Sequence, residues 1–492
     1  MIASESGYDV FMSDFFLHEN ILIRYWVDRC SAYALNGKKI KRAVANIPLS
    51  ITPDIQNNTH NFFPDSYNFK KLYIYCKQQM KIKTTEFINH GVVNVGDLPI
   101  PFDMVLNASA LVVVITFVYL KVSWKESIIT PRQEVFNDKQ NFIGKLFGII
   151  ILFLLVAPGI FGNESSKTSI APLILWVFLW IGVPVLGLLF GDIYSKFNPL
   201  NLFSLKSDKP ESVYFACVLF IGLTWFELVW RRPGNPLNIA VVLITLFVCV
   251  NLLRYFLKKS LIEVDPLLLL HYLYSKLKLF NSKPYFRSLL DNIGNLAKLR
   301  GIEYFVLLMI GTVTYDGLRE TTFWYNQFGS RTDDMGFSTM MFLIMNLGTI
   351  LFYRFACFFA IKVGGSDLEL NHVSNLFGHT MLPIAFAYHV THYLTLLLFE
   401  SQTFFYRFND PIGIGMNLLN VEEPTINYFI EPLVIWGIQV AVTLLGHMLS
   451  VVLAHDLAVK LFGHQQSDKT QYIFLFITVA LTLQALFVLS VG

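Results

Sequence analysis

Long apolar runs separated by polar segments dominate the chain from Phe102 onward. Each run has roughly 20 residues, the length that an α-helix needs to cross the hydrocarbon core of a bilayer. The pattern predicts ten membrane-spanning helices, at residues 102–121, 143–161, 170–190, 213–230, 237–257, 302–316, 338–360, 375–399, 429–453 and 471–490. We therefore expect an all-α fold, a polytopic α-helical integral membrane protein.

The first part of the chain has a different pattern. Residues 1–89 are polar and contain no apolar run long enough to span a membrane. Charged residues interrupt the stretch from Phe11 to Trp26, so it lacks the continuous apolar core of a secretory signal. We expect residues 1–89 to be a poorly ordered tail that precedes a transmembrane bundle formed by residues 90–492.

Lys and Arg are concentrated in the odd-numbered loops between the predicted spans. Because cytoplasmic loops carry an excess of these residues, the odd loops are predicted to be cytoplasmic and both termini extracytoplasmic. This orientation predicts a multi-pass protein of the cell membrane. The longest odd loop contains residues 261–299, which mix leucines with lysines and predict an amphipathic helix at about 264–280 on the cytoplasmic surface.

The composition agrees with a membrane environment, since 54% of the residues are hydrophobic and 15% are charged, whereas soluble domains have about 25% charged residues. No P-loop, GxGxxG motif or basic aromatic patch is present, so nothing indicates nucleic acid as a partner. The five cysteines form no CxxC pair and are interpreted as small core residues. The lipid bilayer is the predicted partner, and the short loops favour association with other membrane subunits.

The segment HTMLPIAFAYHVTHYLTLLLFE, residues 379–400, places three histidines within a predicted span. Ionisable residues inside a membrane are costly and usually face a cavity or a partner. The predicted orientation sorts such residues into two layers. The outer layer contains Glu227, Asp316, His389 and His392, and the inner layer contains His379, His447, His455 and Asp456.

The eighth predicted span is expected to pack against the ninth, because Gly378 and Gly446 allow two helices to approach closely. This packing would bring His379 and His447 together, while His392 would face an acidic residue of the outer layer. The alternative is that each histidine is a hydrogen-bonded packing residue of the helix bundle.

Imidazole and carboxylate groups together suit a transition metal such as zinc or copper, and imidazoles on facing helices can hold haem. The string HVTH is not the HExxH motif of zinc metalloproteases, because its histidines are three residues apart with no glutamate between them. The predicted metal ligands are His379, His392, His447 and His455, and the predicted catalytic carboxylates are Glu227 and Asp316.

Seven strings occur in an order typical of one prokaryotic family: HGVVNVGDLPIP, FGDIYSKFNPLNL, TWFELVW, TYDGLRETTFW, HTMLPIAFAYHVTHYLTLLLFESQ, DPIGIGMNL and GHMLSVVLAHDLAVKLFG. Over residues 90–492 the chain resembles the multi-pass membrane proteins labelled fenitrothion hydrolase-like. The resemblance implies further motif positions at His90, Asp192, Asn198 and Asp456. His389 falls outside the motif, so the resemblance implies a minor role for it.

These patterns leave three functions open. The first, implied by the resemblance, is a metal-assisted hydrolase subunit that acts on apolar esters or organophosphates, since a bound cation activates water. The second is a permease, or a membrane protein that handles metal ions or protons. The third is a membrane subunit that carries haem for redox chemistry.

Overall fold

The computed structural model describes residues 102–491, except for residues 130–139, 164, 204, 206–207, 279–290, 294–295, 297–298 and 366. The expected tail of residues 1–89 and the motif residue His90 lie outside the described residues. All regular secondary structure in the described part of the chain is helical. The predicted all-α architecture is therefore confirmed.

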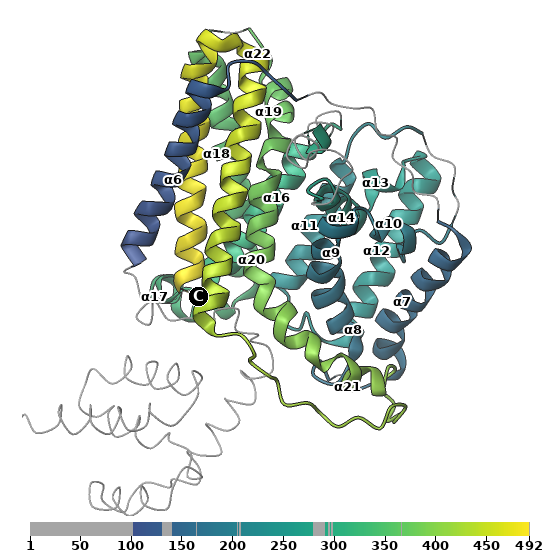
Figure 1. The fold of residues 1–492 in the computed structure, drawn as a ribbon. Helices are drawn as coiled ribbons and strands as arrows, with labels where there is room; N and C mark the ends of the chain where they lie inside the picture. The colour runs from purple at the N-terminus through teal and green to yellow at the C-terminus, as the bar shows by residue number, and fades with distance from the viewer. Residues whose placement is uncertain are drawn as a thin grey trace, which may run out of the picture. The chain divides into compact units, whose positions relative to one another are not determined.

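The helices follow the predicted spans in chain order (Figure 1). The first half contains α6 (Phe102–Ser123), α7 (Phe142–Phe161), α8 (Ile170–Pro172), the π-helix η2 (Leu173–Gly182), α9 (Val183–Phe190), α10 (Tyr194–Phe197), α11 (Tyr214–Leu228), α12 (Pro236–Leu257), α13 (Leu261–Val264) and α14 (Pro266–Ser275). The second half contains α16 (Ile302–Arg319), α17 (Thr322–Phe328), η4 (Gly329–Asp333), α18 (Met335–Val363), α19 (Leu370–Gly378), η5 (His379–Met381), α20 (Leu382–Glu400), η6 (Ser401–Thr403), α21 (Phe404–Asn409) and α22 (Pro432–Val491). Gly463, with φ of 70°, breaks α22 into two helices that correspond to the last two predicted spans.

Eight helical segments among the described residues are long and apolar enough to cross a membrane. They cover every predicted span except 213–230 and 302–316. In the first of these regions α11 has only 15 residues. In the second, α16 carries the charged residues Glu303, Asp316 and Arg319. The polytopic membrane architecture is confirmed, whereas a count of ten spans stays a prediction.

Three helices at the centre of the bundle, α11, α16 and α20, run parallel to one another. Gly301, the N-cap residue of α16, lies against Tyr214 at the start of α11. Gly378, which comes just before η5 and α20, lies against Glu303 in the first turn of α16. We call this end of the bundle the α13 side, because α12 ends there and leads into α13. The opposite end, where α16 leads into α17, is called the α17 side. The parallel arrangement means that residues at matching positions along α11, α16 and α20 lie at similar depths.

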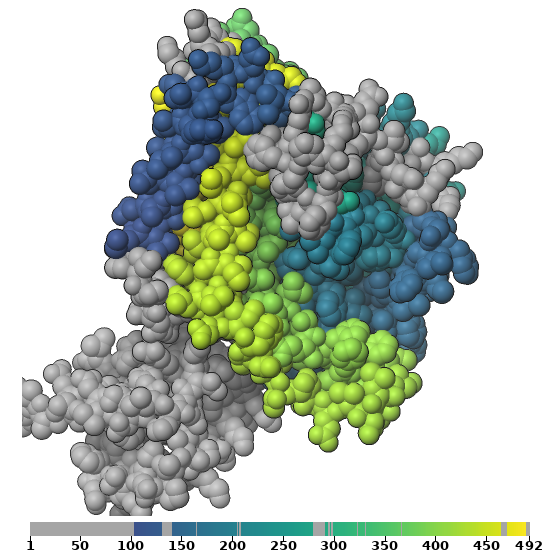
Figure 2. Space-filling model, in the orientation of Figure 1, coloured from purple at the N-terminus to yellow at the C-terminus, as the bar shows by residue number. Residues whose placement is uncertain are grey.

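The helices around this centre turn apolar side chains outward. Exposed examples are Leu111 on α6, Phe153 on α7, Val241 on α12 and Phe355 on α18, whereas α16 and α20 are buried over most of their length. Figure 2 shows α6 and α22 next to each other on one such face, and the two helices are in contact. An apolar outer surface around a buried polar centre is the arrangement that a bilayer favours.

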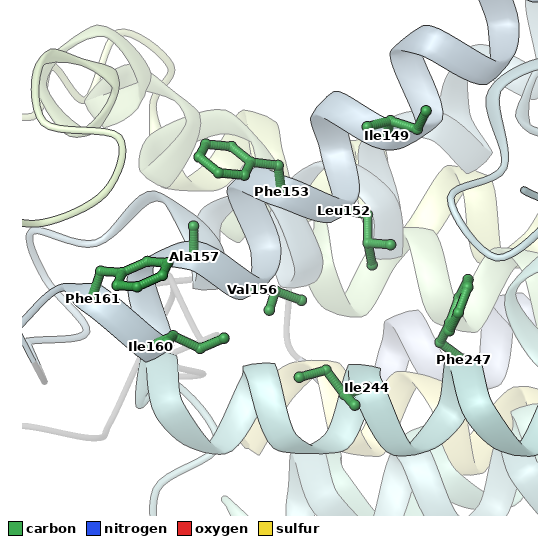
Figure 3. Close-up of a pocket in the computed structure, with 9 residues that line it drawn as sticks. All are labelled: Ile149, Leu152, Phe153, Val156, Ala157, Ile160, Phe161, Ile244 and Phe247. Carbon is green, nitrogen blue, oxygen red and sulfur yellow. The ribbon is translucent and has the colours of Figure 1, made fainter.

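A shallow apolar groove lies between α7 and α12 on this outer surface (Figure 3). Its walls include Phe153 and Ile160 of α7 and Ile244 and Phe247 of α12. All the named residues that line the groove have hydrocarbon side chains, so the groove offers no group for catalysis. We interpret it as part of the lipid-facing surface and not as a candidate site.

The segment after α12 does not form the amphipathic surface helix that the sequence predicts. Every residue of α14 is buried except Tyr272, which is partly buried, and α14 packs against α9, α10, α11 and α20 (Figure 1). The prediction was wrong because the four leucines at 267–270 cover all sides of one helical turn. The lysines that suggested a polar face, Lys276 and Lys278, follow the end of the helix.

Hydrogen bonds fix the start of α14 inside the protein. The Asp265 carboxylate accepts hydrogen bonds from the backbone N–H groups of Leu267 and Leu268, at 2.9 and 3.0 Å, as an N-cap does. Its second oxygen accepts a 2.6 Å bond from the side chain of Asn198. Pro266 occupies the first helical position, where no N–H is required. These contacts hold the start of α14 in the interior of the bundle.

Candidate functional site

The strongest polar cluster lies at the α17 side of the central helices. His392 of α20 and Asp316 of α16 are joined by a hydrogen bond of 2.8 Å between Nε2 and Oδ2. The Tyr393 hydroxyl donates to the same carboxylate oxygen at 3.0 Å. Each side chain of the His392–Asp316 pair is 8% exposed. The prediction that His392 faces an acidic residue of the outer layer is confirmed in its geometry.

Glu227 belongs to the same cluster. It lies one residue before the end of α11 and interacts electrostatically with Asp316 and Tyr393. Its Oε2 atom is buried and has no hydrogen-bond partner. Two carboxyl groups therefore share a buried region with one imidazole and one phenol. Because two ionised carboxylates repel each other in such a place, this cluster favours holding at least one proton.

The cluster approaches the surface through Glu320, the C-cap residue of α16. Its side chain is 18% exposed and lies 3.6 Å from Arg319. Burial raises the pKa of Glu320 to about 7, the Arg319 guanidinium lowers it, and Asp316 raises it further. A carboxyl group with a pKa near neutrality exchanges protons readily with water at physiological pH.

His389 lies deeper in the bundle, towards the α13 side of the cluster. Its Nδ1 is 2.9 Å from the hydroxyl of Tyr274 on α14, and its ring meets the ring of Tyr393 edge-on at 5.2 Å between centroids. Its Nε2 is buried without a hydrogen-bond partner. The resemblance assigned His389 a minor role, yet the structure places it between α14 and the acidic cluster.

His271 is a buried histidine that the sequence analysis did not select. Its Nδ1 is 2.5 Å from the carbonyl oxygen of Leu267, and its Nε2 is 2.9 Å from the carbonyl oxygen of Leu179 in η2. Its ring stacks on Tyr194 with centroids 4.1 Å apart. Because the histidine lies in a leucine-rich loop that was assigned to the surface, no sequence signal pointed to it.

Among the described residues, no hydrogen bond joins His379 to His447, and a site shared by the two stays a prediction. Nδ1 of His379 and Nε2 of His447 are buried without hydrogen-bond partners, so no bond through these atoms joins the two rings. His447 instead binds the Thr443 carbonyl oxygen at 2.7 Å and lies beside the Tyr388 ring, with centroids 5.8 Å apart. The predicted packing of α20 against α22 is nevertheless confirmed.

His455 and Asp456 of α22 hold the segment that follows α6. Asp456 accepts hydrogen bonds from the Trp124 indole, the Ser127 hydroxyl and the Ile128 N–H, at 3.0, 2.8 and 2.8 Å. His455 uses both ring nitrogens, on the Gln471 side chain at 2.6 Å and the Trp124 carbonyl at 2.9 Å. A metal ion would have to displace one of these partners, so the arrangement indicates a structural role.

The remaining motif residues are also structural in their contacts. Asp192 accepts a 3.2 Å bond from the backbone N–H of Ser195 at the start of α10. Asn198 is fully buried and donates to Asp265, the N-cap of α14. Burial raises the pKa of Asp265 to about 6, while the hydrogen bonds from Asn198 and the two backbone amides lower it. Asn198 thus contributes to the site by fixing the helix that carries Tyr274.

Within the described residues, no group of three or more histidine, cysteine or acidic side chains is arranged to hold a metal ion. The four predicted metal ligands have different hydrogen-bond partners and share none. His392 lies with Asp316, His455 with Trp124, and His379 and His447 have no shared partner. The arrangement therefore gives no support to a metal centre built from these histidines.

Comparisons of the chain with known proteins identify no relative. No protein-family model, no curated protein and no solved structure matches it.

Proposed function

We propose that this chain is a proton-handling membrane protein of the permease kind, in which the Asp316–His392 pair binds and releases the proton. The observation that supports the proposal is the 2.8 Å hydrogen bond between these two buried side chains. Ionisable residues inside membrane proteins often mark proton and ion pathways, because burying a charge in the membrane costs free energy and such residues are rare without a function. Imidazole is the group whose ordinary protonation range lies nearest to neutral pH.

The surroundings of the pair favour proton exchange. Tyr393 donates to Asp316 and interacts with Glu227, so the proton has alternative acceptors within the cluster. Glu320 provides a partly exposed carboxyl group on the α17 side that interacts with both Asp316 and His392. A proton can thus enter at Glu320 and reach the pair through neighbouring groups.

The proposal is tested with the full-length protein in liposomes that contain a pH-sensitive dye. A potassium gradient and valinomycin impose a membrane potential, and the change in internal pH reports the proton flux. We expect flux above that of protein-free liposomes, and loss of most of it in Asp316→Asn. Asp208→Asn, which alters an exposed loop carboxylate, is the matched control and should keep the flux.

Two results would contradict the proposal. One is wild-type protein that conducts no more than protein-free liposomes over a range of pH gradients. The other is an Asp316→Asn variant that inserts, remains monodisperse and conducts like the wild type. Insertion is checked by flotation of the liposomes and by size-exclusion chromatography of the detergent-solubilised variant.

We favour a proton over a metal ion because the described histidines do not converge on one point. Elemental analysis of the same purified protein tests this choice, and we expect zinc and copper far below one equivalent per chain. The hydrolase interpretation rests on the resemblance to the fenitrothion hydrolase-like proteins and stays a prediction. A phosphotriester-hydrolysis assay on that preparation, with and without a chelator, tests it directly.

A further inference from the structure

The buried helix α14 reaches the acidic cluster through a continuous series of contacts. The Tyr274 hydroxyl lies 2.9 Å from His389 Nδ1. The His389 ring touches the ring of Tyr393, with centroids 5.2 Å apart, and the Tyr393 hydroxyl donates to Asp316 at 3.0 Å. All of these side chains are buried. Polar groups from α14, α20 and α16 therefore follow one another across the interior of the bundle.

We infer that Tyr274 and His389 form a second part of the proton route, which joins the Asp316–His392 pair to the α13 side. The inference rests on the proposed function, because it extends the path that begins at Glu320. It gives α14 a role in transport, and it makes His389, rather than His379 or His447, the histidine that works with His392.

The chemistry of imidazole permits this transfer without a net change of charge. The Tyr274 hydroxyl gives its proton to Nδ1 of His389 while the phenol oxygen receives another from a water molecule that reaches it from the α13 side. His389 then releases the proton from Nε2 towards Tyr393 and Asp316. One proton enters and one leaves, and a half turn of the ring then brings the remaining N–H to the Tyr393 side, ready for the next transfer. A neutral imidazole suits this task because one nitrogen accepts while the other donates.

The unpartnered Nε2 of His389 supports this direction of transfer. Buried polar atoms usually have hydrogen-bond partners, and Nε2 of His389 is buried without one. Here the ring lies against Tyr393, whose hydroxyl contacts the acidic cluster.

The position of Tyr274 is fixed by the rest of α14. One turn earlier on the helix, His271 binds the Leu179 carbonyl oxygen of η2, and the N-terminus is capped by Asp265. The Tyr274 ring also meets Phe386 of α20 edge-on, with centroids 4.8 Å apart. These contacts hold the hydroxyl at His389, as a proton-transfer group requires.

The simplest alternative is that the bond between Tyr274 and His389 only stabilises packing. The chain offers a matched control for this alternative. Tyr388 is a buried tyrosine on α20 whose hydroxyl donates to the Leu481 carbonyl oxygen, away from the acidic cluster. Replacing either tyrosine by phenylalanine removes one buried hydroxyl and one hydrogen bond, so both variants should lose similar stability.

The experiment compares Tyr274→Phe, Tyr388→Phe and Tyr274→His in the liposome flux assay. We expect Tyr274→Phe to reduce the flux by about tenfold or more, as loss of a proton-transfer group does. Tyr388→Phe should conduct like the wild type. Tyr274→His, which restores a protonatable group near His389, should recover part of the flux that Tyr274→Phe loses. Recovery of this kind is not expected of a purely structural hydroxyl.

A second measurement separates this inference from the proposed function. Infrared difference spectra recorded on a pH change report protonation of the buried carboxyl groups. We expect Tyr274→Phe to keep the carboxyl signal that Asp316→Asn removes. Normal flux in Tyr274→Phe, with flux abolished in Asp316→Asn, would overturn the inference and leave the proposed function intact. Equal flux losses in both phenylalanine variants would also overturn it, because a general loss of packing would then explain the result.

Discussion

His271 of α14 occupies a hydrogen-bond position that Pro184 leaves unfilled in the neighbouring helix. In the π-helix η2 each carbonyl oxygen accepts from the N–H five residues later, and the partner of Leu179 would therefore be residue 184. Proline has no N–H, and the Leu179 carbonyl instead accepts from Nε2 of His271 at 2.9 Å. Two irregularities, a π-helix and a proline, thus create the point at which α14 is anchored.

This relationship predicts a stability loss when the anchor is removed. His271→Ala leaves the Leu179 carbonyl oxygen buried without a donor and opens a cavity beside Tyr194. We expect a loss of about 2 kcal/mol or more in unfolding free energy, measured as a lower thermal unfolding temperature in detergent. His372→Ala, at an exposed position of α19, is the control and should unfold at the wild-type temperature. An unchanged unfolding temperature in His271→Ala would refute the anchor.

The pKa of Glu320 predicts how the flux depends on pH. Burial raises this pKa to about 7, so the carboxyl group is protonated below pH 7 and charged above it. If Glu320 delivers protons to the Asp316–His392 pair, the flux from the α17 side should fall as the pH on that side rises through about 7. Glu320→Gln should remove this inflection.

The control for the pH profile is Glu423→Gln, which alters an exposed carboxyl group in the loop before α22. It should leave both the flux and the inflection unchanged. The profile is measured with an inward gradient from liposomes of fixed internal pH, so that only the external side is titrated. An inflection that persists in Glu320→Gln would assign the titration to another group.

The sequence predicts much of the fold because the bilayer imposes a simple length rule. Apolar runs of about 20 residues correspond to helices, and the described helices coincide with the predicted spans. α14 escaped this rule because it is a buried helix of 10 residues, too short to span. A short apolar run next to lysines looks the same whether it lies on a surface or inside a bundle, since only tertiary contacts distinguish the two.

One contact of the candidate site could be predicted from the depth of its residues in the membrane. His392 and Asp316 were expected at similar depths, and they form a hydrogen bond. Depth does not say which way a side chain points around its helix, so it could not predict that His447 binds the carbonyl oxygen of Thr443 on its own helix. Gly378 shows the same limit, because it packs against Glu303 of α16 rather than against α22.

The contacts of Asp456 predict a structural rather than a catalytic effect of mutation. Asp456→Ala removes the acceptor of three hydrogen bonds from residues 124–128. Because a hydrogen bond to a charged group contributes about 1.5–3 kcal/mol, we expect a clear fall in unfolding temperature and faster proteolysis after α6. Asp367→Ala, at an exposed position after α18, is the control. The fraction that remains folded should conduct protons like the wild type, and a specific loss of flux would instead place Asp456 in the route.

The contact between α20 and α22 gives a prediction with a control on the same helix. A Cβ atom added at Gly446 would lie 2.6 Å from the Ala387 Cβ and 2.7 Å from the Pro383 carbonyl oxygen. Because neither neighbour is a flexible side chain, Gly446→Ala must push the helices apart, and overpacking of this kind costs about 1–3 kcal/mol. The strain acts on Pro383 and Ala387, which precede His389 on the same helix by less than two turns, so the flux should fall together with the unfolding temperature.

Gly437→Ala is the control, since no atom lies within 4 Å of a Cβ added at Gly437. Alanine favours a helix over glycine by about 1 kcal/mol, so this variant should be as stable as the wild type or more stable. Both variants are measured by thermal unfolding in the same detergent, followed by the liposome assay. If Gly446→Ala gains stability as Gly437→Ala does, α20 and α22 are not in close contact at this point.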